Sequence, residues 1–242
     1  MVLSIEGYYL VFGECILDTA SDYRILVVED ALSRLMDIVR YKRLGIPVDW
    51  RKAMDVVSRI KSVVYRIKYS YLPLEYLVKS SDLELLMDYS RQLAGILLDR
   101  DLLSRFKPDP YMVALTRYCL RMLYGLKYRL MLGSDNNPLY AVDIEGVEVV
   151  SVHKHPDADR LYITRAEGIL GYTIVTNIQD IKKGEIRAAV ILPPAIIRGQ
   201  LSEAMYCSNP LPREYKKKRP PENLVFKEEV IRHVYAITTK EK

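Results

Sequence analysis

The densest cluster of chemically versatile side chains is His153-Lys-His-Pro-Asp-Ala-Asp-Arg-Leu161. Its alternating histidines and aspartates imitate the start of a binuclear metal site in hydrolases. Such a site needs a histidine at position 158, where this chain has Ala158, and more distant histidine ligands, of which only His233 remains. The chain therefore has too few ligands to hold two metal ions. The simpler interpretation is a polar turn between two strands, shaped by Pro156 and the two aspartates.

No other pattern in the chain indicates catalysis. The sequence has no Walker loop, no glycine-rich dinucleotide turn, no His-Glu-x-x-His and no Gly-x-Ser-x-Gly. No nucleophile or base is spaced to work with His153 or His155. We therefore expect a protein that is not an enzyme and that needs no cofactor or metal.

The composition is that of a folded protein. The chain has 242 residues, with 36 Lys plus Arg, 31 Asp plus Glu and a formal charge of +5, which by itself says little about partners. No apolar run approaches the roughly 18 to 20 residues of a membrane span. Three scattered cysteines, Cys15, Cys119 and Cys207, form neither a disulfide set nor a zinc pattern. These features favour a cytoplasmic protein without membrane contact.

The sequence changes character near residue 140, where tyrosine becomes rarer and glycine and proline become more frequent. The turn-forming stretch Gly133-Ser-Asp-Asn-Asn-Pro138 is typical of a linker. We predict a helical domain over residues 1–135, a linker over 136–143, a small β domain over 144–212 and a basic arm with a C-terminal extension over 213–242.

Helical periodicity dominates the first half. Asp49 is placed to cap one helix, Ser81-Asp-Leu-Glu84 has the pattern of a capping box, and Asp109-Pro110 is a cap followed by the proline favoured at a helix start. A further apolar stripe, from Val28 to Val39, predicts a fourth helix. Four amphipathic helices indicate an all-helical, bundle-like domain. Residues 1–26, which include Tyr8–Phe12, are ambiguous between strand and helix.

The second half predicts strands. Short runs of β-branched and aromatic residues alternate with glycine and proline, which is typical of a small closed barrel. The predicted strands are Val147 to Val152, Leu161 to Ala166, Tyr172 to Thr176, Ile186 to Leu192 and Met205 to Cys207. Pro193 and Pro194 are expected to separate two of them.

Four motifs in this half occur in a recognisable order. They are His155-Pro-Asp-Ala-Asp-Arg-Leu161, Val175-Thr-Asn177, Lys183-Gly184 before an apolar strand, and Arg198-Gly-Gln-Leu-Ser-Glu-Ala-Met205. In this order they resemble the tRNA-binding OB-fold domain family, over residues 144–212 only. Members of that family occur as appendages of methionyl-tRNA synthetases and near the N-terminus of the phenylalanyl-tRNA synthetase β chain. Ala204 stands where the family usually has glycine.

The resemblance implies a five-stranded OB-fold barrel that recognises the folded shape of tRNA. Carried over from the family, Ser202 and Met205 would lie in the binding groove, with Gln200 in the same motif. Asn177 at a strand end could read a base edge. Cations near these motifs are candidates for phosphate contacts. They are Lys154, Arg160, Lys182, Lys183, Arg187 and Arg198.

Two further segments extend this expectation. The basic run Lys216-Lys-Lys-Arg219, followed by two prolines, indicates an exposed arm that contacts phosphates, or else a solubilising connector. Phe226 to Ile237 has the pattern of a short docking element, which suggests a homodimer. Basic and aromatic residues also share helical stripes, as Arg117, Arg121, Tyr124 and Tyr128 do. These could contact RNA or simply lie half-buried between helices.

The sequence thus favours a non-catalytic tRNA-binding protein that serves an aminoacyl-tRNA synthetase as an accessory factor. The alternative is a chaperone-like or scaffold protein that holds polypeptide in the same groove.

Overall fold

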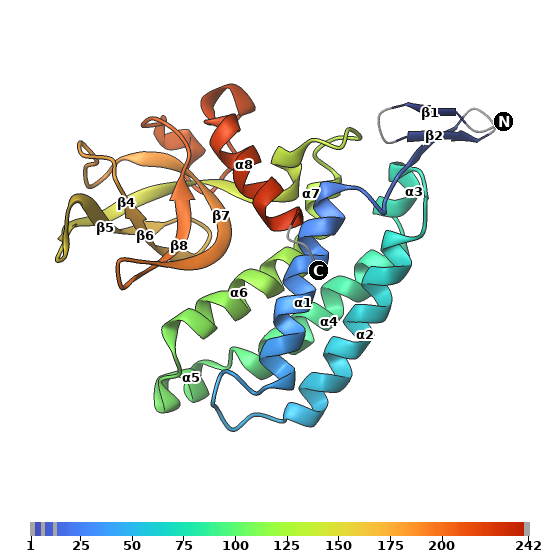
Figure 1. Ribbon diagram of the computed structural model, residues 1–242, viewed down its shortest axis with the longest axis horizontal. Coiled ribbons are helices and arrows are strands. Elements are labelled where there is room, and N and C mark those ends of the chain that lie inside the picture. Colours follow the sequence, from blue (N-terminus) through green and yellow to red (C-terminus); the bar gives the residue numbers. More distant parts are fainter. Residues whose placement is uncertain (1–2, 6–7, 12–13, 240–242) are drawn as a thin grey trace. The chain divides into compact units, whose positions relative to one another are not determined.

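The computed structural model describes residues 3–5, 8–11 and 14–239, and the chain divides into two compact units. The helical unit comprises Met1–Ala141 with Val234–Lys242, and the sheet unit comprises Val142–His233. Figure 1 shows the elements of each unit in the order of the chain.

Four long helices form the core of the helical unit, and each packs against two of the others (Figure 1). Helix α1 neighbours α2 and α6, and α4 neighbours the same two helices. Their bounds are α1 Tyr23–Arg40, α2 Trp50–Lys68, α4 Ser81–Leu97 and α6 Pro110–Tyr124. The predicted bundle of four helices is therefore confirmed. Shorter elements complete the unit: α3 Leu74–Val78, α5 Arg100–Phe106, α7 Leu126–Leu130 and the 3-10 helix η1 Pro138–Ala141.

The helix starts agree with the sequence in two cases and differ in one. The Asp49 carboxylate accepts a hydrogen bond from the Lys52 N–H at 2.9 Å, and Asp109 accepts one from the Tyr111 N–H at 3.0 Å. The predicted capping box at Ser81 is wrong, because α4 already begins there. The N-cap is Ser80, which makes no side-chain cap hydrogen bond.

The helical unit begins with strands. Three short antiparallel strands, β1 Leu3–Ile5, β2 Tyr8–Val11 and β3 Glu14–Leu17, form a sheet in the order β1-β2-β3. The prediction of an all-helical first domain is therefore wrong for this segment, and the ambiguous stretch from Tyr8 to Val11 is a strand. Phe12 lies outside the described residues.

The turn-rich segment expected to be a linker is hydrogen-bonded to the start of α1. Arg24 is 1% exposed and forms an ion pair with the Asp22 carboxylate at 2.6 Å. Its Nη1 donates to the Gly133 carbonyl at 2.6 Å, and the Asn136 side chain accepts from the Tyr23 N–H at 2.9 Å. Because a buried guanidinium needs such partners, residues 133–136 belong to the fold of the helical unit.

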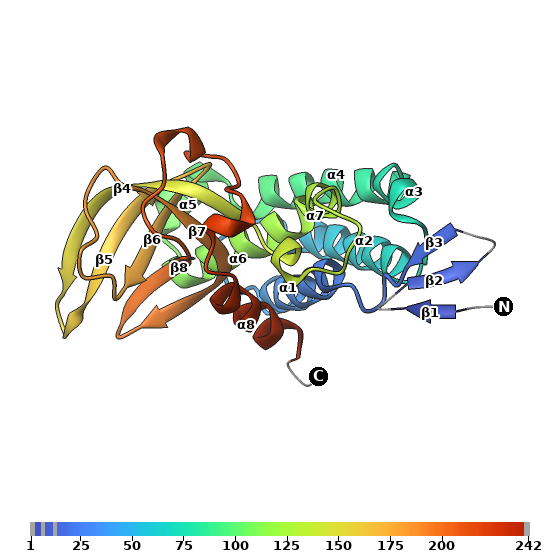
Figure 2. The same ribbon diagram turned by 90° about the horizontal axis from the view of Figure 1, so that it is seen from above.

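The sheet unit contains one five-stranded antiparallel sheet in the order β6-β5-β4-β7-β8 (Figure 2). The strands are β4 Ile144–His155, β5 Ala158–Glu167, β6 Gly171–Thr176, β7 Ile186–Ile197 and β8 Gln200–Tyr206. All five predicted strands exist. Two 3-10 helices follow, η2 Arg213–Tyr215 and η3 Glu222–Leu224, and then α8 Lys227–Thr238.

Pro193 and Pro194 do not end a strand, as was predicted, but lie inside β7. The pairing of β7 with β8 shifts register between Ile191 and Ala195. A proline lacks the N–H that a regular ladder uses, and a bulge is a place where that N–H is not needed. The bulge therefore lets β7 continue to Ile197.

The sheet curls but does not close through a backbone ladder, so the prediction of a closed barrel is wrong in that respect. Its two edge strands, β6 and β8, nevertheless lie beside each other. Inside the curl, the Thr164 and Tyr206 hydroxyls share a hydrogen bond of 2.9 Å. Burial raises the pKa of Tyr206 to about 12, so this hydroxyl stays protonated at neutral pH.

Helix α8 carries the apolar residues that the sequence suggested as a docking element. Val230, Val234 and Ile237 are all buried within this chain. Their spacing places all three on one face of the helix.

The backbone of the C-terminal segment runs against β4 at Gly146. The Gly146 N–H donates to the Lys218 carbonyl at 2.8 Å, and the Lys217 N–H donates to the Gly146 carbonyl at 2.8 Å. A Cβ at Gly146 would meet the Tyr215 carbonyl oxygen at 2.0 Å. Only glycine permits this approach.

We therefore expect Gly146→Ala to destabilise the protein by about 1–3 kcal/mol, as overpacking does. Calorimetry should show a melting temperature several degrees lower. Gly171→Ala is the matched control, because nothing lies within 4 Å of a Cβ added there. Equal melting temperatures for the two variants would contradict the proposed backbone contact.

Candidate nucleic-acid interface

Two hairpin turns of the sheet unit carry exposed cations. The β4–β5 turn lies between Lys154 and Arg160, and the β7–β8 turn contains Arg198; all three side chains are exposed. In Figures 1 and 2 the two turns lie on the same side of the curled sheet. Three of the cations predicted to contact phosphates are thus exposed in or beside these two turns.

The β4–β5 turn is shaped by a buried histidine. His155 is 4% exposed, and its Nδ1 accepts a hydrogen bond from the Asp157 N–H at 3.0 Å. A register shift between Lys154 and His155 marks a bulge at the same place. The predicted turn is therefore present, and His155 shapes it.

The β7–β8 turn holds an arginine in a backbone conformation that arginine rarely adopts. Ile197 pairs with Gln200, and the two residues between them have positive φ, 50° at Arg198 and 81° at Gly199. Positive φ at both central residues defines the tight hairpin turn in which Asn-Gly is preferred. Strained residues gather at functional sites, and the side chain held here is an exposed cation.

Ser202 and Met205 lie on opposite faces of β8. Ser202 is 6% exposed, whereas Met205 is half-buried on the other side of the strand. The Ser202 hydroxyl accepts from the Val175 N–H at 3.0 Å and donates to the Ala204 carbonyl at 3.1 Å. These contacts occupy the Ser202 hydroxyl in the fold, so the predicted joint surface of these two residues is not formed.

Glu203, the next residue of β8, also accepts a hydrogen bond from a backbone N–H of β6. Its carboxylate accepts from the Thr173 N–H at 2.9 Å. The N–H groups along the free edge of β6 are thus bonded by side chains of β8. We call these two hydrogen bonds, from Val175 to Ser202 and from Thr173 to Glu203, the seam.

Arg187 does not reach the surface. It is 4% exposed, its Nε pairs with the Glu185 carboxylate at 2.8 Å, and its Nη1 donates to the Ser208 carbonyl at 3.2 Å. The prediction that Arg187 contacts phosphate conflicts with this burial. Lys182 and Lys183 are exposed in the loop before β7.

The basic run 216–219 is not a free arm. Lys216 pairs with the Glu148 carboxylate at 2.5 Å, and Arg219 donates to the Val142 carbonyl at 3.1 Å. The hydrogen bond between Lys216 and Glu148 raises the pKa of the lysine and lowers that of the glutamate. Lys217 and Lys218 are exposed, so these two side chains can meet a ligand without breaking a contact of the fold.

The remaining predicted residues lie near the sheet edge. Asn177 follows β6 and is exposed, and Gln200 opens β8 and is half-buried. Sequence reasoning missed Arg165, which is exposed in β5 and donates to the Thr173 hydroxyl at 2.9 Å. The signal was available, because Arg165 alternates with the buried Thr164 and Ala166.

The described histidines, cysteines and carboxylates do not form a metal site. No group of three such side chains that could hold an ion occurs among the described residues. Burial raises the pKa of Cys207 to about 12 and that of Cys119 well above its usual range. Both are therefore buried thiols at neutral pH, and thiols are poor nucleophiles.

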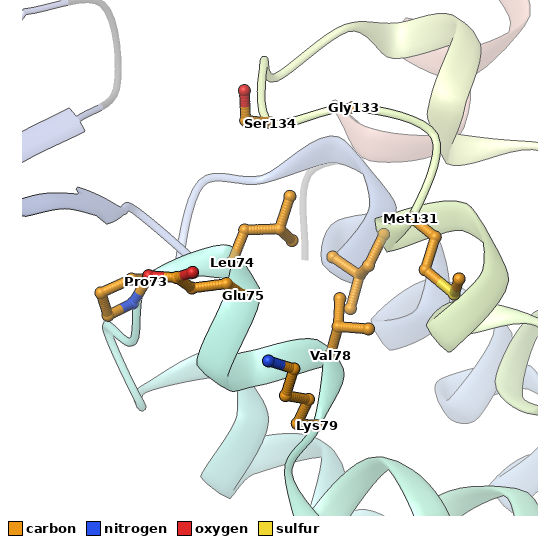
Figure 3. Close-up of a pocket in the computed structure, with 9 residues that line it drawn as sticks. Pro73, Leu74, Glu75, Val78, Lys79, Met131, Gly133 and Ser134 are labelled. Atoms are coloured by element: carbon orange, nitrogen blue, oxygen red, sulfur yellow. The ribbon is translucent and has the colours of Figure 1, made fainter.

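The helical unit contains a separate, open pocket of about 520 Å³. It lies between α3 and the segment after α7, and Figure 3 shows Leu74, Val78 and Met131 facing its space, with Lys79 at its rim. None of the predicted site residues lines it.

Two comparisons with known proteins each match part of the chain. Residues 16–133 match a family described as alpha helical domain. The chain is also 39% identical over 74 residues to the phenylalanine–tRNA ligase beta subunit of Neisseria meningitidis serogroup B. That alignment covers 25% of this chain and 9% of the ligase subunit, so the chain spans less than a tenth of that relative. Among the described residues, no helix has both the length and the apolar character of a membrane span.

The seam generates a prediction about stability. Ser202→Ala removes the acceptor of the buried Val175 N–H, and an unsatisfied buried donor costs about 1–3 kcal/mol. We expect a lower melting temperature and faster hydrogen exchange at the Val175 amide. Ser151→Ala, at a half-buried serine of β4, is the control. Unchanged exchange at Val175 would contradict the seam.

Proposed function

We propose that this protein is a non-catalytic, cytoplasmic tRNA-binding protein and that the two hairpin turns, on one side of the curled sheet, form its tRNA-facing surface. The observation that carries the proposal is the exposure of Lys154, Arg160 and Arg198 in or beside two turns on one side of the curled sheet. Phosphates supply most of the binding free energy in such complexes, and exposed cations are what they require.

Two further observations support the proposal. Arg198 has an exposed side chain and lies in a turn whose backbone favours asparagine, so the cation occupies a position where it costs stability. Arg165 adds a cation on β5, a central strand of the sheet. Curled five-stranded sheets of OB-fold type bind nucleic acids on such strands and on the adjacent loops.

We also infer an association with an aminoacyl-tRNA synthetase. The likeness to a tRNA ligase subunit supports this part of the proposal. Holding tRNA close to a synthetase would raise its local concentration without any chemical step. The helical unit, which matches a separate helical family, is the candidate for the contact with that enzyme.

The test of tRNA binding is a titration of the full-length protein with unfractionated tRNA at several salt concentrations. The variant carries Lys154→Gln, Arg160→Gln and Arg198→Asn; asparagine keeps the positive φ of the turn. We expect weaker binding and a log–log salt slope reduced by about two to three, because roughly one counterion is released per phosphate contact.

The control variant removes the same charge elsewhere. It carries Arg59→Gln, Arg100→Gln and Arg105→Gln, all at exposed positions of the helical unit. Equal loss of affinity in both variants would show that binding depends only on the net charge of the protein, and it would overturn the proposed surface. Binding of unfolded polypeptide that tRNA does not displace, with little salt dependence, would favour the chaperone-like alternative.

A further inference from the structure

The segment from the last residue of α1 to the first turn of α2 is an exposed, basic part of the helical unit. Residues 40–52 read Arg-Tyr-Lys-Arg-Leu-Gly-Ile-Pro-Val-Asp-Trp-Arg-Lys, with five cations and one carboxylate. The carboxylate, Asp49, caps α2 through the Lys52 N–H. We call Arg40, Tyr41, Lys42 and Arg43 the α1 knuckle; all four side chains are exposed.

The backbone holds the α1 knuckle in a fixed shape. The Lys42 N–H donates to the Val39 carbonyl at 3.2 Å, and the Arg43 N–H donates to the Ile38 carbonyl at 3.0 Å. This pair of hydrogen bonds ends many helices, and it places one residue in the left-handed conformation where glycine is usual. Here that residue is Lys42, with φ 52°. As at Arg198, a cation occupies a strained position.

Tyr41 holds the two arginines beside it. Its side chain is 60% exposed, and the guanidinium carbons of Arg40 and Arg43 lie 5.7 Å and 5.4 Å from the centre of its ring. Contacts of this kind are attractive and orient the guanidinium groups. They keep two positive charges close together on the surface.

No carboxylate within residues 17–239, the part of the chain whose side chains are described, forms an ion pair with Arg40, Lys42 or Arg43. Like charges held together repel each other, which destabilises the free protein. An anionic ligand would relieve that repulsion. The surface is thus complementary to a polyanion.

We propose that the α1 knuckle is a second RNA-contact surface, which binds the phosphate backbone of tRNA through Arg40, Lys42 and Arg43. Tyr41 pre-organises the two guanidinium groups. This inference deepens the proposed function and rests on tRNA being the ligand. Interleaved aromatic and basic residues favour RNA over an acidic peptide, because guanidinium groups bind phosphates and stack on bases.

The chain offers a reporter beside this surface. Trp50 is the single tryptophan of the protein, and it lies half-buried at the first residue of α2. Its fluorescence therefore reports on the α1–α2 connection alone. We expect unfractionated tRNA, added to the full-length protein, to change the Trp50 emission with a saturating, salt-sensitive curve.

The test variant carries Arg40→Gln, Lys42→Gly and Arg43→Gln. Glycine removes the strain at position 42, so the melting temperature should stay equal or rise while tRNA affinity at about 100 mM salt falls about tenfold. Tyr41→Phe should bind like the unmodified protein, and Tyr41→Ala should bind more weakly. The Arg59, Arg100 and Arg105 variant is again the charge-matched control.

The outcomes separate this inference from the proposed function. Unchanged affinity in the knuckle variant, with weaker binding in the variant of the two hairpin turns, would overturn the inference alone. The reverse pattern would support the inference and overturn the proposed sheet surface. A Trp50 response to vesicles of phosphatidylserine and phosphatidylcholine, without any response to tRNA, would overturn the RNA assignment.

Discussion

The seam is the interaction on which the sheet unit depends. The N–H groups of Thr173 and Val175 lie at the free edge of β6, where no strand continues the ladder, and side chains of β8 accept their hydrogen bonds. A buried N–H without an acceptor is unfavourable. Ser202 and Glu203 therefore let the sheet curl without closing it through the backbone, and the curl gives the hairpin turns their positions.

The cations of the sheet unit and of the α1 knuckle fall into two groups, those paired within the fold and those exposed. Arg187 and Lys216 are bound by Glu185 and Glu148, so their charges stabilise the fold. Arg198 and Lys42 have exposed side chains, and each has a positive φ, which is unfavourable for a residue other than glycine. A positive φ at an exposed cation, Arg198 in one case and Lys42 in the other, is a feature that the proposed tRNA surface shares with the α1 knuckle.

Much of the fold was predictable from local pattern. Helical periodicity located the four long helices, and short β-branched and aromatic runs between glycines and prolines located the five strands, because both signals depend on neighbouring residues. The sequence could not show that β7 passes through Pro193 and Pro194, since a bulge depends on the partner strand. It also could not show that the basic run lies along β4, which depends on the close approach at Gly146.

The candidate site was less predictable than the fold. The motif that contains Ser202 and Met205 suggested one surface, yet strand alternation places the two side chains on opposite faces. Lys154, Arg160 and Arg198 remain exposed because they lie in or beside turns, where side chains are not needed for packing. Pairing of a cation with a distant carboxylate, as for Lys216 with Glu148, cannot be read from sequence spacing.

Hydrogen–deuterium exchange of the full-length protein with and without tRNA tests the central claim most directly. The account predicts slower exchange in peptides that cover residues 154–160 and 197–203 when tRNA is bound. Unchanged exchange in both segments at saturating tRNA, or protection confined to the pocket around residues 73–79, would contradict it.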